Sequence, residues 1–186
     1  MRFWILPAFL LLLWADADAQ REQTVFRDLR LSGVWGAYNF NMSFYGNEVP
    51  NIQGGYGGLE FNRLLYMGWG GYRQRDFLQN GTAGDIPFRL KYNGFVLGIT
   101  PWAKKIVHPR IGFLVGPGRI LLPGDRSDRV RVLKPSAGLE LNVFEVLRLG
   151  IEGGYRFITR QDVPELNTND TSAPFVQVDI RFGCSW

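Results

Sequence analysis

Cysteine and histidine are almost absent from this sequence, which contains one of each. A lone cysteine, Cys184, cannot form an internal disulfide, so packing or a membrane must stabilise the fold. The chain has no Cys/His cluster for zinc, and the segment GDRSDR carries two acids, too few for a calcium loop. The sequence therefore implies no metal site and no cofactor.

Long apolar runs are missing after Trp14, which excludes membrane crossing by helices. The run from residue 3 to residue 14 is too short to span a bilayer. It follows Arg2 and precedes an A-x-A sequence ending at Ala19, an arrangement typical of a cleaved secretory signal peptide. We therefore expect a signal peptide (residues 1–19), an N-terminal tail (residues 20–30) and a single domain (residues 31–186).

A strong excess of one charge is also lacking, since the formal net charge is +4. The lysines and arginines are scattered through the chain and do not cluster on one helix face. Neither feature favours nucleic-acid binding, and export argues against it as well. We expect no nucleic-acid partner.

What the sequence does contain is strict alternation, clearest in the last eleven residues, VQVDIRFGCSW. Successive side chains of a strand point to opposite faces, so this segment has one apolar face and one face with an acid and a base. Similar alternation predicts eight strands, near residues 31–43, 54–62, 64–75, 86–100, 109–121, 136–143, 147–157 and 176–186. In the fourth of these the parity changes, which predicts a bulge at Asn93-Gly94.

The connections between these strands alternate between long polar segments and shorter links. An even number of strands, with long loops at one end and short turns at the other, is the plan of an outer-membrane barrel. The apolar segments, of about nine to eleven residues, are also long enough to cross the hydrocarbon when tilted.

Either face could be the inside. In a soluble fold the charged residues would be the wet surface, whereas in a membrane barrel they would fill the lumen and pair with one another. Aromatics near strand ends favour the membrane, because they suit interfacial girdles. These aromatics are Tyr38, Phe40, Tyr92, Tyr155, Phe157, Phe182 and Trp186. The predicted lumen charge network is Glu60, Arg89, Lys91, Arg110, Glu140, Arg148, Glu152, Arg156, Asp179 and Arg181.

Together, the signal peptide, the eight alternating strands and the terminal VDIRFGCSW resemble the small outer-membrane barrels of the OmpA and OmpX type. KPSAGLELN, LRLGIEGGYRF and FVQVDIRFG are similar to barrel proteins of Bacteroidetes. The resemblance implies an all-β, eight-stranded, antiparallel up-and-down transmembrane β-barrel, porin-like, in the outer membrane of a Gram-negative cell envelope. It also implies that the last strand carries the signal read by the barrel-insertion machinery, with Phe182 or Trp186 as its aromatic end.

A barrel of eight strands has an interior that side chains can fill, so we expect no open pore. The expected role is structural or surface interaction through long loops, with no catalytic residue. Outer-membrane lipid and lipopolysaccharide are the expected partners, because arginine binds phosphate through two hydrogen bonds. The arginines expected at the loop end are Arg73, Arg75, Arg119, Arg126, Arg129, Arg131 and Arg160.

Two other functions stay open at this stage. An outer-membrane lipid-modifying enzyme would need a nucleophile beside a base. His108, the one histidine, lacks the H-x-S spacing of the lipid A deacylase and is interpreted as a turn residue at the short-turn end. A soluble lipocalin-like carrier would turn the apolar faces inward around a ligand cavity.

Overall fold

The computed structural model describes residues 29–78, 87–124, 126–159 and 171–186. The expected signal peptide, most of the expected tail and Arg160 lie outside the described residues. In the part of the chain that is described, no helix has the length and apolar character needed to cross a membrane.

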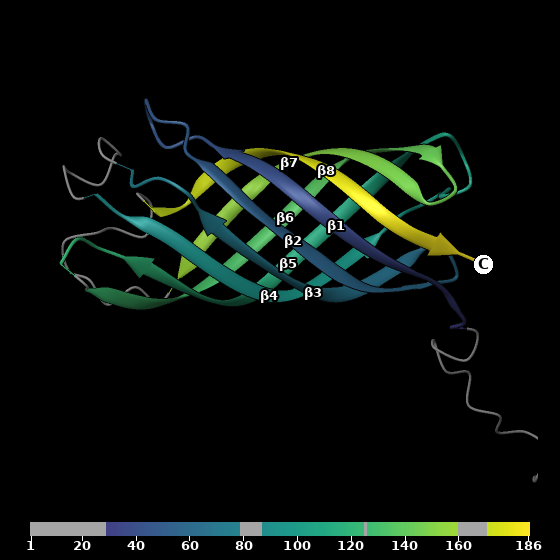
Figure 1. Cartoon of the computed structure of the whole chain (residues 1–186), viewed down its shortest axis with the longest axis horizontal. Helices are drawn as coiled ribbons and strands as arrows, with labels where there is room; N and C mark the ends of the chain where they lie inside the picture. Colours follow the sequence, from purple (N-terminus) through teal and green to yellow (C-terminus); the bar gives the residue numbers. More distant parts are fainter. Residues whose placement is uncertain (1–28, 79–86, 125, 160–170) are drawn as a thin grey trace, which may run out of the picture.

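Eight antiparallel strands follow one another around a closed barrel (Figure 1). Their bounds are β1 Leu31–Ser43, β2 Asn51–Phe61, β3 Leu65–Gln74, β4 Arg89–Ile99, β5 Val107–Leu121, β6 Ser127–Phe144, β7 Leu147–Thr159 and β8 Ala173–Ser185. Each strand pairs with its neighbour in sequence, and β1 pairs with β8 from Gly33↔Ser185 to Ser43↔Phe175. This last pairing leaves the sheet without an open edge, as a strand structure in a bilayer requires.

The two ends of the barrel differ, as Figure 1 shows. We call the turn end the one that holds the C-terminus and the connections 62–64, 100–106 and 145–146. The loop end holds the connections 44–50, 75–88, 122–126 and 160–172, of which 75–88 and 160–172 are longer than any connection at the turn end. Strand β6 is longer than the sequence predicted, because it begins at Ser127 and not near residue 136.

The outer wall of the barrel is apolar. Large side chains such as Ile111, Ile151 and Phe182 are more than half exposed on it. A soluble monomer rarely exposes so much contiguous apolar surface, so this wall is the face that meets lipid. Six of the seven predicted girdle aromatics are on this wall: Tyr38, Phe40, Tyr155, Phe157, Phe182 and Trp186.

Tyr92 is the exception, because it lies inside the barrel and stacks on Tyr72 with ring centroids 5.0 Å apart. The expected bulge at Asn93-Gly94 is also absent. The pairing of β4 with β3 runs without a shift through both residues, and its register with β5 is the same on either side of them. The apparent change of parity in the sequence has another cause, which is that the interior near the loop end is itself apolar.

Candidate functional site: the barrel lumen

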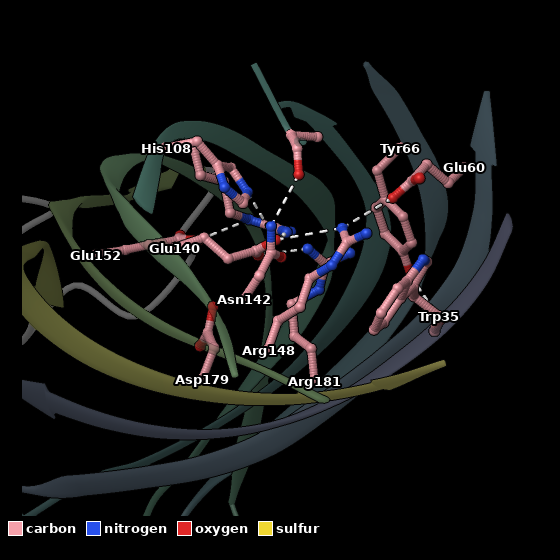
Figure 2. Close-up of polar contacts among 12 residues, drawn as sticks. Trp35, Glu60, Tyr66, His108, Glu140, Asn142, Arg148, Glu152, Asp179 and Arg181 are labelled. Carbon is pink, nitrogen blue, oxygen red and sulfur yellow. Dashed lines mark hydrogen bonds and ion pairs between the residues drawn. The ribbon is translucent and has the colours of Figure 1, made fainter. Parts of the chain in front are cut away.

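Glu140 on β6 is the centre of an ionic cluster in the turn half of the lumen (Figure 2). His108 Nε2 lies 3.2 Å from Glu140 Oε1, and Arg148 Nη1 lies 3.4 Å from the same oxygen. Arg110 Nη1 donates to Glu140 Oε2 at 3.1 Å, and Arg181 Nη1 donates to that oxygen too. One carboxylate therefore joins side chains from β5, β7 and β8 across the lumen.

Two further carboxylates extend this cluster. Arg148 Nη1 also donates to Glu60 Oε2 at 3.1 Å, and its guanidinium carbon lies 3.9 Å from the centre of the Trp35 ring. Arg110 Nε lies 2.7 Å from Glu152 Oε1. Each of these acids faces an arginine, which offsets the cost of removing their charges from water.

Halfway along the barrel the network becomes one of amides and acids. Asn39 Nδ2 donates to Asp179, and Gln177 Nε2 donates to Asp179 Oδ2 and Glu152 Oε2, both at 3.2 Å. Lys134 Nζ donates to Gln177 Oε1 and lies 4.4 Å from the centre of the Phe175 ring. These residues connect the ionic cluster to the loop half of the lumen.

The loop half contains one guanidinium and no carboxylate partner for it among the described residues. Arg156 donates to Tyr45 Oη at 3.1 Å, to Asn41 Oδ1 at 2.9 Å and to Ser43 Oγ at 3.0 Å. Beyond it the interior is filled by an apolar plug. The plug consists of Ile52, Leu78, Phe88, Leu90, Ile120, Val130, Val132 and Ile158, all buried.

Buried side chains line the described part of the lumen from the turn end to the loop end. A small, partly open cavity of about 20 Å³ lies between Tyr56, Arg110, Lys134 and Glu152, comparable to the space that a single water molecule needs.

Eight of the ten residues predicted for the lumen network are buried inside the barrel. They are Glu60, Arg110, Glu140, Arg148, Glu152, Arg156, Asp179 and Arg181. Arg89 and Lys91 were predicted wrongly, since Leu90 and Tyr92 face the lumen and these two bases lie on the outer wall. The reason is that the apolar side of this part of β4 packs into the plug and not against lipid.

His108 is a second correction. It is the second residue of β5, is buried, and has both ring nitrogens engaged: Nε2 near Glu140 and Nδ1 3.0 Å from the carbonyl oxygen of Lys105. It belongs to the ionic cluster and is not a turn residue. The strand parity that places Arg110 inside also places His108 inside, and that signal was available in the sequence.

Lys134 is the buried charge that sequence reasoning missed. It shares the inward parity of Glu140 and Ser136, but the strand was predicted to begin only at Ser136. The predicted strand left out Pro135 and the residues before it. In the structure Pro135 pairs with Phe113 inside the sheet.

The arginines predicted for the loop end lie on the outer wall or in the connections. Arg73, Arg119, Arg129 and Arg131 are exposed strand residues, whereas Arg75 and Arg126 lie in connections next to strands. Among the described residues, no group of three or more His, Cys, Asp or Glu side chains could hold a metal ion.

Comparison with solved structures identifies the type of fold. The crystal structure of Neisserial surface protein A (NspA) matches with a TM-score of 0.57 and 12% identity, covering 83% of this chain and 96% of that one. Ail, the attachment invasion locus protein of Yersinia pestis, matches with a TM-score of 0.46 and 16% identity over 82% of this chain and 97% of Ail. No protein-family model matches the sequence, and a comparison with curated proteins found no match.

At these identities the likeness concerns the fold. The chain is an eight-stranded antiparallel β-barrel of the small bacterial outer-membrane type, as the sequence predicted. This fold and the apolar outer wall are those of a protein of the bacterial outer membrane.

Proposed function

We propose that this protein is a closed outer-membrane barrel with a structural or surface-interaction role, and that it neither conducts solutes nor catalyses a reaction. The observation that carries the proposal is the filled lumen. The ionic cluster around Glu140 closes the turn half, and the apolar plug closes the loop half. Such a barrel is a rigid support for whatever its loop end contacts.

The orientation follows the general plan of bacterial barrels, with short turns in the periplasm and longer loops outside. Outer-membrane lipid and lipopolysaccharide are the proposed partners in the membrane, and a surface partner would bind the connections at the loop end. The barrel-insertion machinery is proposed to read the last strand. Phe182 points outward from β8. The backbone N–H of Trp186 donates to the backbone carbonyl oxygen of Ser32 at 2.7 Å.

The surroundings of His108 favour a structural role over lipid modification. A base that activates a nucleophile needs a ring nitrogen free to accept its proton. Both His108 nitrogens have partners, and the residue lies inside the turn half of the lumen, away from the expected outer leaflet.

The first test is conductance of the purified protein in a planar lipid bilayer. We expect no stepwise current, because the ionic cluster and the plug leave no continuous water path. A stable unitary conductance would contradict the closed lumen.

A second test uses intact cells and protease-sensitive epitopes. Gly124 is exposed in the connection 122–126, and an epitope inserted after it leaves this glycine, whose φ is +77°, unchanged. The matched control inserts the same epitope at Glu145, in a connection at the turn end. We expect cleavage at position 124 only. Cleavage at position 145 alone would show that the orientation is the reverse of the proposed one. Release of the protein from membranes without detergent would overturn the membrane assignment.

A further inference from the structure

Four basic side chains form a row on the outer wall near the loop end. Arg73 on β3 pairs with Lys91 on β4, Lys91 pairs with Arg119 on β5, and Arg119 pairs with Arg129 on β6. All four are exposed. We call these residues the basic row.

The basic row is unfavourable for the barrel alone. Like charges directly opposite one another on neighbouring strands repel and destabilise a sheet. Neighbouring strands are separated by about 5 Å, so three such pairs stand side by side. A row of this kind is expected where an anion neutralises it.

The wall is hollowed beside the row. The hollow has a volume of about 940 Å³, is lined by all four bases, and has no acidic residue among those that line it. Gly71, Asn93 and Pro117 contribute to its lining. Gly71 pairs with Gly55 on β2 and with Asn93 on β4. Because the two glycines have no side chains, the wall is recessed at this point.

Below the hollow, toward the turn end, the wall becomes apolar. Trp69 on β3, which is 56% exposed, pairs with Phe95, and Phe95 pairs with Val115. The hollow therefore lies at the border of the lipid-facing surface, with bases on one side and apolar side chains on the other. Lipid phosphates occupy this depth in a bilayer.

We propose that this hollow binds the phosphorylated headgroup of an outer-leaflet lipid, the phosphorylated glucosamine part of lipopolysaccharide. The phosphate groups lie on the basic row, and an acyl chain runs over Gly71 toward Trp69. Arginine donates two parallel hydrogen bonds to a phosphate, and three of the four bases are arginines. The proposal rests on the proposed orientation, which places the loop end in the outer leaflet.

Binding is tested with the full protein in detergent, titrated with purified lipid A and followed by native mass spectrometry. The double variant Lys91→Gln/Arg119→Gln removes the two central charges. We expect its affinity for lipid A to fall by at least about tenfold. The matched control, Lys104→Gln/Lys105→Gln, removes the same charge from the connection 100–106 at the turn end and is expected to bind as the unmodified protein does.

A steric variant separates the hollow from its charge. A Cβ added at Gly71 would have the Asn93 Cβ as its nearest contact, at 4.0 Å, so Gly71→Leu fits the fold and fills the hollow. We expect weaker binding of lipid A with all four bases still present. If Gly71→Leu and Lys91→Gln/Arg119→Gln both bound lipid A as tightly as the unmodified protein does, the proposal would be overturned.

Two further binding measurements distinguish a lipid-bound phosphate from a free phosphate ion as the ligand. Dephosphorylated lipid A is expected to bind weakly, and inorganic phosphate is expected not to compete at millimolar concentration. Full competition by inorganic phosphate would mean that the site binds free anions and would overturn the lipid assignment. Because the assay is done in detergent, it does not depend on orientation. Lipid A binding in detergent together with cleavage only at position 145 in cells would contradict the proposed orientation. The hollow would then bind a phosphorylated lipid, but its assignment to an outer-leaflet lipid would be overturned.

Discussion

The two halves of the lumen are lined by side chains of opposite chemistry. In the turn half, Glu140 bridges four positively charged or ring-nitrogen groups from three strands. In the loop half, Arg156 is held by hydroxyl and amide oxygens and is covered by the apolar plug. Strands β2, β5, β6 and β7 supply side chains to both halves, so along these strands the difference comes from position; Leu78 and Phe88 reach the plug from the connection 75–88.

Ion pairs and apolar packing contribute to a barrel interior in different ways. Paired charges fix the relative positions of distant strands, but each unpaired member is costly. Apolar side chains close the interior by packing, and their removal leaves a cavity. The two halves are therefore expected to respond differently to substitution.

The largest effect is expected from Glu140→Gln. This change removes the negative charge shared by Arg110, Arg148 and Arg181 and leaves their buried charges with fewer partners. We expect a loss of about 3–5 kcal/mol in the free energy of unfolding, measured by urea titration in lipid vesicles. Glu145→Gln, at an exposed position in a turn-end connection, is the control. Equal stability of the two variants would show that the ionic cluster contributes nothing.

The plug is tested by Ile158→Ala. Ile158 is fully buried in the loop half, so truncation leaves a cavity and is expected to cost about 2–4 kcal/mol in the same urea titration. Ile151→Ala removes the same atoms from the outer wall of the same strand, where lipid can fill the space. A loss at Ile151 as large as that at Ile158 would contradict the assignment of inner and outer faces.

Two inward-facing glycines of β7 allow the stability cost of one added methyl group to be compared between the two halves. A Cβ at Gly154, in the loop half, would lie 2.2 Å from the Pro135 carbonyl oxygen, whereas at Gly150, in the turn half, its nearest contact is the Asp179 Cβ at 3.4 Å. We expect Gly154→Ala to cost about 1–3 kcal/mol and Gly150→Ala to change stability by less than about 1 kcal/mol. Thermal unfolding on a gel would rank the two variants, and the reverse order would refute this packing difference.

The smallest effect is expected from Lys134→Met, at the border of the two halves. The ammonium group has one hydrogen bond, to Gln177, and lies against the Tyr72 and Phe175 rings. A methionine can keep these ring contacts without burying a charge, so we expect a change within about 1 kcal/mol. Arg110→Met, which takes a charge away from Glu140 and Glu152, should cost clearly more in parallel urea titrations. Similar losses in both variants would argue that Lys134 belongs energetically to the ionic cluster.

Strand alternation predicted much of this structure, because a period of two needs no tertiary information. Eight strands, VQVDIRFGCSW as the last of them, and eight lumen residues follow from it. Alternation also places His108 on the same inward face as Arg110. The histidine was nevertheless interpreted as a turn residue. Lys134 was not predicted as a lumen residue, because the predicted strand began only at Ser136. In the structure Pro135 is paired inside the strand, so Lys134 belongs to it as well.

The prediction failed in the part of β4 whose inner face is apolar and whose outer face carries two bases, Arg89 and Lys91. Tyr92 was expected to face lipid and Lys91 the lumen, under the assumption that the interior is polar throughout. The structure shows the reverse in this part of β4, because the plug requires apolar side chains inside the loop half. No local pattern distinguishes a lipid-facing tyrosine from one that stacks on Tyr72.

The sequence by itself determined the strands and which residues share a face, since both depend on the geometry of a single extended chain. Only the tertiary structure decided which charges meet, because the ion pairs of Glu140 join β6 to β5, β7 and β8. It also decided that the basic row exists, because four bases far apart in the sequence become neighbours only through the register of four strands. Pairing register depends on closure of the whole barrel, and that is a property of all eight strands together.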